Sequence, residues 1–482
     1  MSALRGSGLN KAEVMTNSDT AYWARQGARI RTAANDLKRT GDALADELGE
    51  PSEVIDAVFV GAADPPTYER VICRMVEAYP ISRLDLEVRR DDTDEGVVYW
   101  TADAARASSR VFDRADRHGQ LTPYYEYRDL AMSSVGPYRP EWIKELRVVA
   151  GDNPDDPDVA YNIGHMRHTI TFFVGPVNCY WRDGDVSRMA QMDTGDSNYI
   201  TPMVPHSFAS RDASREALIV AVTFDGSLGG EAQQELAILD IGRLAGELPD
   251  VTQPSRAFSR VLQKEMATGM RTSEHLAARS GIRYERLTGL LDGTALPNSE
   301  EFEALAKSLE LNVRDLMPPQ AVDRRQVVVR HASSDAEWHY PSEELPRYRV
   351  QELAGSRKVP VNGMAVQVLE SSPAASDGLL DLATSSHEFA YNYGDEPVNL
   401  YWRGSKEIRC VVVAPGDSYY VKPTTAHAVR ALEGGAASVL MVRVGGALTG
   451  DSAWELASLP ETALDRVISE TAQWYDPKGR GG

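Results

Sequence analysis

The chain has 482 residues, 42% hydrophobic and 25% charged, which is the composition of an ordinary globular protein with room for roughly two to four domains. Its formal net charge of −20 excludes a broad nucleic-acid-binding surface, which would carry an excess of basic residues. Three cysteines are too few for a disulfide framework and too far apart for a paired zinc motif. The polar N-terminus has no apolar export core, and no apolar run is long enough to span a membrane. We therefore expect a cytoplasmic protein without a membrane partner.

Two short helical segments resemble each other in sequence. Thr40–Gly49 aligns with Thr272–Gly281. In both, apolar residues recur at three-to-four spacing between an initial Thr and a final Gly, which predicts short helices joined by a tight turn. This is the pattern of a helix-turn-helix.

The segments between and after these helices also repeat. The matching pairs keep one constant offset and are Pro176–Arg182 with Pro397–Arg403, Gly195–Ser197 with Gly416–Ser418, and His206 with His427. Alternating apolar residues with Gly, Asp and Pro at the turns predict short antiparallel strands that close into a small β-barrel. A repeat of this kind indicates that the barrel occurs twice.

The sequence thus predicts an α+β protein in which a helix-turn-helix-like domain and a β-barrel occur twice in tandem. In chain order we expect a helical domain at 20–88, a barrel with the metal site at 96–226, a linker at 227–254, a second helical domain at 255–318, a degenerate structural barrel at 326–446 and a C-terminal tail at 447–482. Trp454 and Trp474 suggest that the tail forms one or two packing helices.

Histidines stand at both ends of the first repeat. A barrel brings these ends to its mouth, so His165 and His206 can converge on one ion, and two histidines plus a third ligand are typical of non-heme Fe(II) oxygenases. His168 lies three residues from His165 and shares its side only if the strand bends there. Thr169, a water or a substrate oxygen are the alternatives, because residues 159–182 contain no carboxylate. Iron with neutral protein ligands keeps its full charge, which favours a chelating dianionic substrate.

The second repeat keeps only part of this set. His387 and His427 correspond to His168 and His206, but Ala383 or Thr384 stands in place of His165. We therefore expect the second barrel to be a structural partner that has lost its metal. Glu388 follows His387 directly, so along a strand it faces the opposite side.

The helical segments offer little for DNA recognition. The expected reading positions of the first segment, 51–53, are acidic or neutral, whereas the second segment offers Arg283, Tyr284 and Arg286. The net charge favours a packing or lid role over nucleic-acid binding. Self-association through these segments into a homo-oligomer is a further expectation.

Together these motifs resemble the phosphonate-oxidising cupins, the family of hydroxyethylphosphonate dioxygenase, methylphosphonate synthase and hydroxypropylphosphonate epoxidase. The resemblance rests on Asn162–His165, on Gly195–Ser197 followed by Pro205–Ser207, on the loop 152–156 and on the doubled order of helical domain and barrel. It implies a bicupin that uses Fe(II) and O2 to oxidise a small hydroxyalkylphosphonate. The implied substrate is 2-hydroxyethylphosphonate, cleaved at its carbon–carbon bond to methylphosphonate or hydroxymethylphosphonate.

The resemblance also implies a substrate site. Lys38 precedes Thr40 as the family lysine precedes its helix, and a lysine from a separate domain would close the site over the substrate. The implied catalytic residues are Lys38 and Tyr125, the implied substrate-binding residues are Lys38, Arg117, Tyr125, Tyr127, Asn162 and Ser197, and the metal ligands are His165, His206 and His168.

This chain departs from the family at the third ligand. The dioxygenase has a glutamate six residues before its last histidine, where this chain has Ile200. The synthase has an isoleucine there and a glutamine four residues after its first histidine, where this chain has Thr169. Ile200 favours the synthase branch, and His168 is the expected replacement ligand. The rival hypotheses are an oxidase or epoxidase acting on another phosphonate, and a non-enzymatic regulator that binds DNA with steep salt dependence.

Overall fold

The structure, a computed structural model, describes residues 17–318, 326–332, 337–356, 359, 361–371, 380–432, 437–448 and 450–468. The chain divides into two compact units, the first comprising Met1–Asp94, Ser133–Gly136 and Gly446–Gly482, and the second Glu95–Met132 and Pro137–Gly445. Trp474 lies outside the described residues. Among the described helices, none has the length and apolar character needed to cross a membrane.

The first unit is helical. Its elements are α1 (Asn17–Asp36), α2 (Gly41–Leu48), α3 (Ser52–Phe59), α4 (Pro65–Ala78), the 3₁₀ turn η1 (Arg83–Asp85), α13 (Gly450–Ser458) and α14 (Glu461–Ile468). The Thr40 side chain accepts a hydrogen bond from the Ala43 N–H and so caps α2, and Gly49 ends this helix with φ +66°. The inner faces of the four N-terminal helices bury one core that includes Leu44, Ile55 and Val71.

A second helical segment, within the second unit, repeats these features. Its helices are α6 (Glu231–Leu236), α7 (Ile241–Glu247), α8 (Pro254–Thr268), α9 (Ser273–Ser280), α10 (Tyr284–Leu291), α11 (Ser299–Leu309) and α12 (Val313–Leu316). Thr272 caps α9 and the left-handed Gly281 ends it, just as Thr40 and Gly49 bound α2. The paired Thr and Gly residues are therefore the start and stop signals of equivalent helices.

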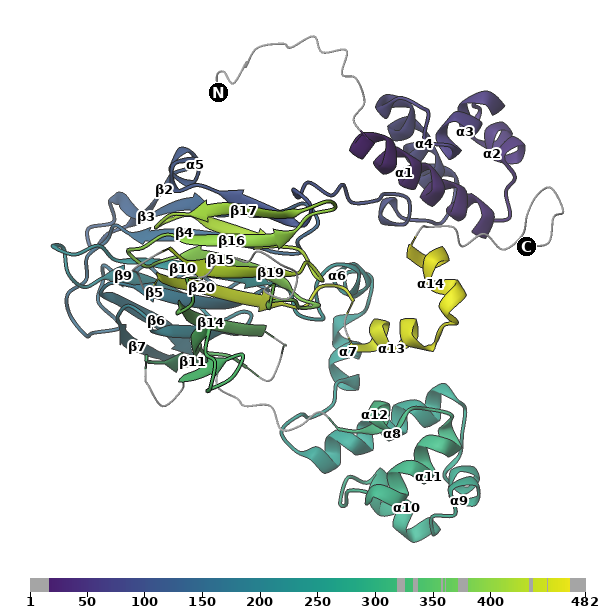
Figure 1. The fold of residues 1–482 in the computed structure, drawn as a ribbon. Coiled ribbons are helices and arrows are strands. Elements are labelled where there is room, and N and C mark those ends of the chain that lie inside the picture. Colours follow the sequence, from purple (N-terminus) through teal and green to yellow (C-terminus); the bar gives the residue numbers. More distant parts are fainter. Residues whose placement is uncertain are drawn as a thin grey trace. The chain divides into compact units, whose positions relative to one another are not determined.

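The strands of the second unit form two similar sets, each with a seven-stranded and a three-stranded antiparallel sheet (Figure 1). We call them the first and second β-modules. The first has the sheets β11-β8-β5-β10-β4-β3-β2 and β7-β6-β9, and the second has β1-β18-β15-β20-β14-β13-β12 and β17-β16-β19. The short helix α5 (Ala102–Ala107) follows β1. The prediction of an α+β protein built on antiparallel sheets is confirmed.

The strands of the first module are β2 (Arg110–Ala115), β3 (Leu121–Asp129), β4 (Arg139–Glu145), β5 (His168–Val174), β6 (Val177–Asp183), β7 (Val186–Met192), β8 (Ser197–Ile200), β9 (His206–Ser210), β10 (Leu218–Phe224) and β11 (Val327–Arg330). Those of the second are β1 (Val97–Trp100), β12 (Glu337–Tyr340), β13 (Tyr348–Glu352), β14 (Val361–Val368), β15 (His387–Asn392), β16 (Val398–Arg403), β17 (Ile408–Val413), β18 (Ser418–Val421), β19 (His427–Ala431) and β20 (Ala437–Val444).

The two modules exchange one strand each. Strand β1 precedes the first module in sequence but pairs with β18 of the second, and β11 precedes the second module but pairs with β8 of the first. The aspartates of the Gly-Asp-Ser motifs hold the exchanged segments: Asp417 accepts a hydrogen bond from the Ala102 N–H at 2.7 Å, and Asp196 accepts one from the Ala332 N–H at 2.8 Å. The sequence analysis had assigned 96–226 and 326–446 to separate barrels, so this exchange is a departure from it.

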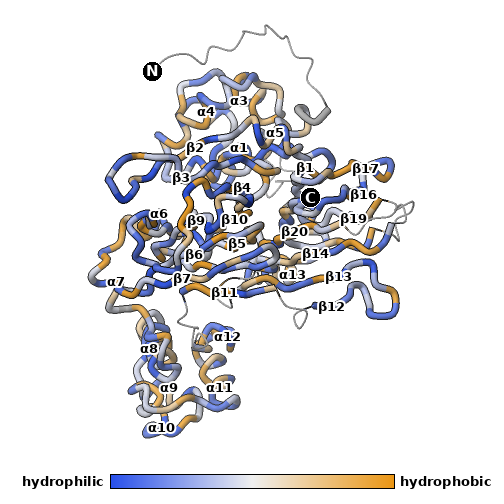
Figure 2. The backbone as a smooth tube through the Cα atoms, turned by 90° about the vertical axis from the view of Figure 1, so that its left-hand side faces the viewer, coloured by the Kyte–Doolittle hydropathy of each residue, from blue (hydrophilic) through white to orange (hydrophobic). Residues whose placement is uncertain are grey.

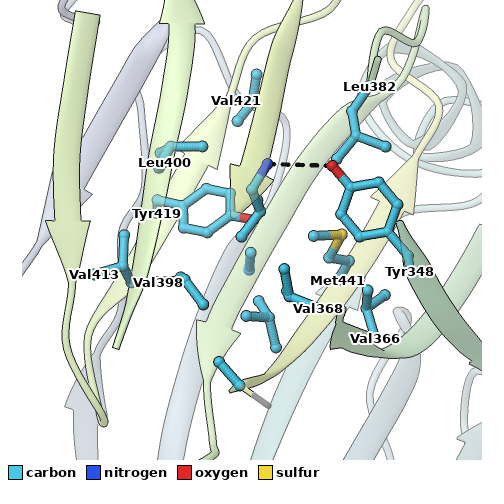
Figure 3. Close-up of a cluster of buried hydrophobic side chains, with 14 of the residues drawn as sticks. Tyr348, Val366, Val368, Leu382, Val398, Leu400, Val413, Tyr419, Val421 and Met441 are labelled. Carbon is cyan, nitrogen blue, oxygen red and sulfur yellow. Dashed lines mark hydrogen bonds between the residues drawn. The ribbon is translucent and has the colours of Figure 1, made fainter. Parts of the chain in front are cut away.

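The interiors of the two modules differ. Figure 3 shows the second module filled by aliphatic side chains around Tyr348 and Tyr419. In the first module, Phe173, Ile200 and Ile219 belong to a comparable core, but buried polar side chains lie beside it. The backbone in Figure 2 changes repeatedly between hydrophobic and hydrophilic residues along its strands, as expected for strands with one buried face. The first module is therefore the one whose interior offers polar side chains for a functional site.

Candidate active site

The first module contains a cavity of about 240 Å³ between its two sheets. The cavity wall brings together six residues that the sequence predicted for the site: Tyr125 and Tyr127 from β3, Asn162 and His165 from the loop before β5, Thr169 from β5, and His206 at the start of β9. Residues separated by as many as eighty positions in sequence thus line one space.

His165 and His206 face each other across the cavity wall. Their ring centroids are 5.3 Å apart and their planes are nearly perpendicular, at 89°. His206 Nδ1 donates a hydrogen bond to the Val204 carbonyl at 2.8 Å, which leaves the lone pair on Nε2. Burial lowers the pKa of His206 to about 4 and also lowers the pKa of His165. Both imidazoles are therefore neutral at pH 7, the form that binds a metal.

The backbone before His165 is closely packed. Gly164 has φ +78°, and a Cβ atom on it would lie 2.5 Å from the Met203 carbonyl carbon, so only glycine fits here. The next residue, His165, accepts a hydrogen bond from the Met203 N–H at 2.7 Å through its carbonyl. This contact fixes the loop that carries His165 against the turn that leads to His206.

Asn162 is oriented by backbone donors. Its Oδ1 accepts hydrogen bonds from the Gly164 N–H at 2.9 Å and from the His206 N–H at 3.0 Å. The amide nitrogen must therefore point the other way, where it lies 3.0 Å from His206 Nε2. Because Nδ1 of His206 carries the proton, the Asn162 N–H donates to the Nε2 lone pair, the atom with which His206 would bind a metal.

His168 does not line the cavity, so the geometry gives no support to its prediction as the third ligand. It starts β5, its Nδ1 is hydrogen-bonded to the Tyr199 hydroxyl at 2.7 Å, and its ring stacks on Phe224 with a centroid distance of 5.8 Å. Side chains alternate along a strand, so the next residue, Thr169, faces the cavity instead. Thr169 Oγ1 is buried without a hydrogen-bond partner in the described part of the chain.

Arg117 is also absent from the cavity. It is exposed, its Nε donates to Asp158 Oδ2 at 2.6 Å, and its NH2 lies 3.3 Å from Asp156. Arg114, which the sequence analysis did not select, lines the cavity from β2. Within the described residues its guanidinium forms neither a hydrogen bond nor an ion pair, so it can receive an anion.

Ser197 and Lys38 have other surroundings. Ser197 does not line the cavity; its Oγ is buried and accepts a hydrogen bond from the Ala354 N–H at 2.8 Å, which makes a contact between the two modules. Lys38 follows α1 in the first unit, with φ +61°, and its Nζ donates to the Asp36 carbonyl at 3.0 Å. The cavity belongs wholly to the second unit, so the structure tests no role for Lys38 in it.

The two tyrosines of the cavity are neutral phenols. Tyr125 accepts a hydrogen bond from the Phe208 N–H at 3.0 Å and lies 3.2 Å from Ser207 Oγ. Burial raises the pKa of both Tyr125 and Tyr127 well above that of free tyrosine. Each hydroxyl therefore keeps its proton and can donate it in a hydrogen bond to an anion.

Along nearly its whole length the chain is similar to proteins of known function. A methylphosphonate synthase from Nitrosopumilus maritimus (strain SCM1) is 36% identical over 463 residues, which cover 95% of this chain and 97% of that protein. The chain belongs to the methylphosphonate synthase family. No family model matches it.

Two further members of this wider group are similar to the chain. The solved structure of the Streptomyces albus enzyme HEPD, with 2-hydroxyethylphosphonate and Fe(II) bound, is 36% identical, has a TM-score of 0.84, and covers 95% of this chain and 100% of its own. An (S)-2-hydroxypropylphosphonic acid epoxidase from Streptomyces wedmorensis is 28% identical over 135 residues, which cover 28% of this chain and 62% of that protein.

The donor set of this methylphosphonate synthase family member fits a divalent iron. The two neutral imidazoles present nitrogen ligands, and His165 Nδ1 is buried without a hydrogen-bond partner among the described residues. In the same part of the chain, no group of three His, Cys, Asp or Glu side chains is arranged to hold a metal. The remaining ligands would be oxygens of water or substrate. The Thr169 hydroxyl can donate a hydrogen bond to such an oxygen.

Proposed function

We propose that this protein is a non-heme Fe(II) oxygenase that uses O2 to oxidise a small hydroxyalkylphosphonate, namely 2-hydroxyethylphosphonate, with cleavage of its carbon–carbon bond. The observation that carries the proposal is the convergence of His165, His206, Asn162 and Arg114 on one cavity. Membership of the methylphosphonate synthase family supports it, and so does the 2-hydroxyethylphosphonate and Fe(II) in the similar Streptomyces albus structure. In this proposal the two β-modules are the barrels of a bicupin.

In the proposed site, His165 and His206 hold the iron, which when bound supplies a Lewis acid and a centre for O2 activation. Arg114 and the Tyr127 hydroxyl donate hydrogen bonds to phosphonate oxygens, and guanidinium groups suit such oxyanions. Asn162 directs its amide N–H at a substrate oxygen beside His206. Tyr125 keeps its side chain in place through Phe208 and Ser207.

Lys38 is proposed to add a further positive charge to the phosphonate site from the first unit. An ammonium group is a compact point charge that suits a dianion, and a residue from a separate unit can enclose the substrate when that unit closes. The Lys38 backbone has a positive φ, which is uncommon for a residue with a side chain and fits a defined turn between α1 and α2.

The absence of a carboxylate at the third ligand position favours a substrate with a high negative charge. With two neutral histidines, iron keeps both positive charges, so a substrate that chelates through two negatively charged oxygens is favoured. Ile200 is fully buried and apolar, so it cannot supply the carboxylate ligand that the dioxygenases have at its position. We therefore propose methylphosphonate as the product.

The rival hypothesis of a DNA-binding regulator gains no support. Arg286, one of its three candidate reading residues, forms a bidentate pair with Glu301, with both N–O distances at 2.8 Å. A guanidinium engaged in this way is not available to a base or a phosphate.

The proposal is tested by anaerobic loading with Fe(II), addition of 2-hydroxyethylphosphonate and O2, and phosphorus NMR of the products. We expect a methylphosphonate signal that is lost in His165→Ala and in His206→Ala. The matched control is His168→Ala, which removes a histidine outside the cavity and should retain iron. Iron bound without turnover would show that the substrate is wrong, whereas no iron binding would contradict an iron oxygenase.

A further inference from the structure

One acidic side chain lies on the wall of the cavity that receives the anionic substrate. Glu141 is on β4, where alternate side chains, Glu141 and Ile143, face the cavity. Its Cα partner on β10 is Ala221, which in turn pairs with Thr171 on β5. All four residues line the cavity, and the small Ala221 side chain covers little of the wall beside the carboxyl group.

The Glu141 carboxyl group has no partner of its own. Within the described residues it accepts no hydrogen bond and forms no ion pair, although two arginines are close enough to influence it. Both of these cations are engaged elsewhere: Arg110 with Asp129 at 2.9 Å, and Arg167 with Asp225 at 3.2 Å. This half-buried carboxyl group on the cavity wall is therefore left to bind water or a ligand.

The charges that face Glu141 do not compensate for the burial of its ionised form. Burial raises its pKa, Arg110 and Arg167 lower it, and Asp129 on the adjacent β3 raises it. The other facing residues, Tyr127 on β3 and Ala221 on β10, carry no charge. The sum is a raised pKa, so the neutral acid is more accessible here than at an exposed glutamate.

A carboxylate and a carboxylic acid have opposite effects on a bound phosphonate. The ionised group would repel the dianion, whereas the neutral acid donates an O–H···O⁻ hydrogen bond, which is among the stronger ones in proteins. An unpartnered acid on the wall of an anion site is therefore expected to bind its ligand in the protonated form.

We propose that Glu141 is a substrate-binding residue whose carboxylic acid donates a hydrogen bond to a phosphonate oxygen. This inference rests on the proposed function. Binding then requires a proton on Glu141, so substrate binding takes up a proton whenever this group is ionised in the free protein. The affinity for the phosphonate falls as the pH rises through the pKa of Glu141.

The test is calorimetric titration of 2-hydroxyethylphosphonate into the anaerobic Fe(II) protein and into the metal-free protein. Each titration is run in two buffers of different ionisation enthalpy and at several pH values between 6 and 9, so that proton uptake is measured directly. Glu141→Gln keeps a neutral donor and cannot ionise, and Glu141→Leu removes the donor. The matched control is Glu126→Gln on β3. The native Glu126 carboxylate accepts hydrogen bonds from Ser109 and Arg128, and it does not line the cavity.

We expect the wild-type protein and Glu126→Gln to take up more protons on binding than Glu141→Gln. The ratio of the wild-type Kd to the Glu141→Gln Kd should rise with pH, by up to about tenfold per pH unit above the pKa of Glu141. The phosphonate's own titration cancels in this ratio. Glu141→Leu should bind about tenfold more weakly than Glu141→Gln at every pH.

Equal proton uptake and equal pH dependence in the wild-type protein and Glu141→Gln would overturn the assignment while leaving the proposed function intact. An absence of binding by the wild-type protein at every pH would overturn the proposed function itself, and this assignment with it. Circular dichroism and the iron content of each variant separate a lost contact from a lost fold.

Discussion

Glu388 on β15 occupies the register position that Thr169 occupies on β5. Thr169 pairs with Thr223 on the last strand of its module, and Glu388 pairs with Arg443 on the last strand of the other. In the second module, Glu388 Oε1 lies 3.1 Å from His427 Nε2, and Glu388 Oε2 accepts a hydrogen bond from Arg443 Nε at 2.7 Å. A guanidinium group therefore supplies the positive charge beside His427.

The histidines that precede this pair are equivalent as well. His168 bonds the Tyr199 hydroxyl and His387 bonds the Tyr420 hydroxyl, both at 2.7 Å. This correspondence shows that the contact of His168 belongs to the shared architecture of the modules. In the second module, the carboxylate at the position equivalent to Thr169 reaches His427 of β19, which corresponds to His206 of β9.

We predict that Thr169→Glu increases the affinity of the first module for Fe(II). The introduced carboxylate would face the cavity, as Glu388 faces His427, and would add a charged ligand to the two histidines. Loss of a group that only hydrogen-bonds a metal ligand already changes metal affinity by about 10- to 100-fold, so a carboxylate bound to the metal itself should change it by at least as much. Competition with a chromogenic chelator under anaerobic conditions measures the change.

Two variants serve as controls for this prediction. Thr169→Val removes the hydroxyl at nearly constant volume, and His168→Ala alters the opposite face of β5. Neither should increase iron affinity, and an unchanged affinity in Thr169→Glu would mean that this position does not reach the metal.

We predict that Glu388 stabilises the fold at neutral pH and loses this effect in acid. Burial raises the pKa of Glu388, but His427 and Arg443 lower it by more than burial raises it. The pKa is therefore about 2, below the ordinary value of 4.5. Because the folded pKa is the lower one, the ionised group contributes stability above pH 4.5, and that contribution is lost as the pH falls towards 2. Glu388→Gln should cost about 3 to 5 kcal/mol and flatten this part of the pH profile of unfolding.

The matched control is the double variant Glu388→Thr with Arg443→Thr, which installs the Thr169 and Thr223 pair of the first module. It leaves no buried charge without a partner, so it should be more stable than Glu388→Thr alone. Urea unfolding of the wild type, Glu388→Thr, Arg443→Thr and the double variant gives the coupling energy. A double variant no more stable than the single one would show that the ion pair is not coupled.

The sequence predicted the repeats well because their signals are local. Alternating strands, the Thr and Gly ends of α2 and α9, and the separation of His165 and His206 all depend on short stretches of chain. The alternation of side chains also indicated that His168 would leave the cavity unless the strand bent. The sequence could not show which sheet β1 and β11 join. An apolar run such as 97–98 is compatible with pairing in either module.

The arginine of the cavity was missed for a related reason. The pairing of β2 with β3 shifts by one residue between Phe112 and Asp113. The extra residue is Tyr124 of β3, so the residue of β2 that stands opposite each residue of β3 beyond this point cannot be counted from sequence. Arg117 stands beyond that strand and pairs with Asp158, whereas Arg114 lines the cavity.

We predict that the two serines of the Gly-Asp-Ser motifs contribute to stability and not to substrate binding. Ser197 Oγ accepts from the Ala354 N–H, and Ser418 Oγ accepts from the Ala131 N–H, both at 2.8 Å and both buried. Replacement by alanine leaves a buried N–H without a partner, which costs about 1 to 3 kcal/mol. Thermal unfolding of Ser197→Ala and Ser418→Ala should show similar losses.

The Michaelis constant separates this role from binding. Both variants should keep the wild-type KM for the phosphonate at a temperature where they are folded. A KM that rises in Ser197→Ala but not in Ser418→Ala would return Ser197 to the substrate site.

We predict that Arg114 binds the substrate and that Arg117 does not. Arg114→Ala removes a cation from the cavity wall that has no partner among the described residues, and the loss of a charge-assisted hydrogen bond weakens binding by about 10- to 150-fold. Arg117→Ala breaks only an exposed pair with Asp158, so substrate binding should be unchanged. Steady-state kinetics with 2-hydroxyethylphosphonate, with calorimetric binding under anaerobic conditions as a second readout, measures both variants. The two arginines lie three residues apart, and of the two Arg114 lines the cavity. Equal effects of the two substitutions on KM would therefore show that Arg114 acts only through its charge and makes no direct contact with the phosphonate.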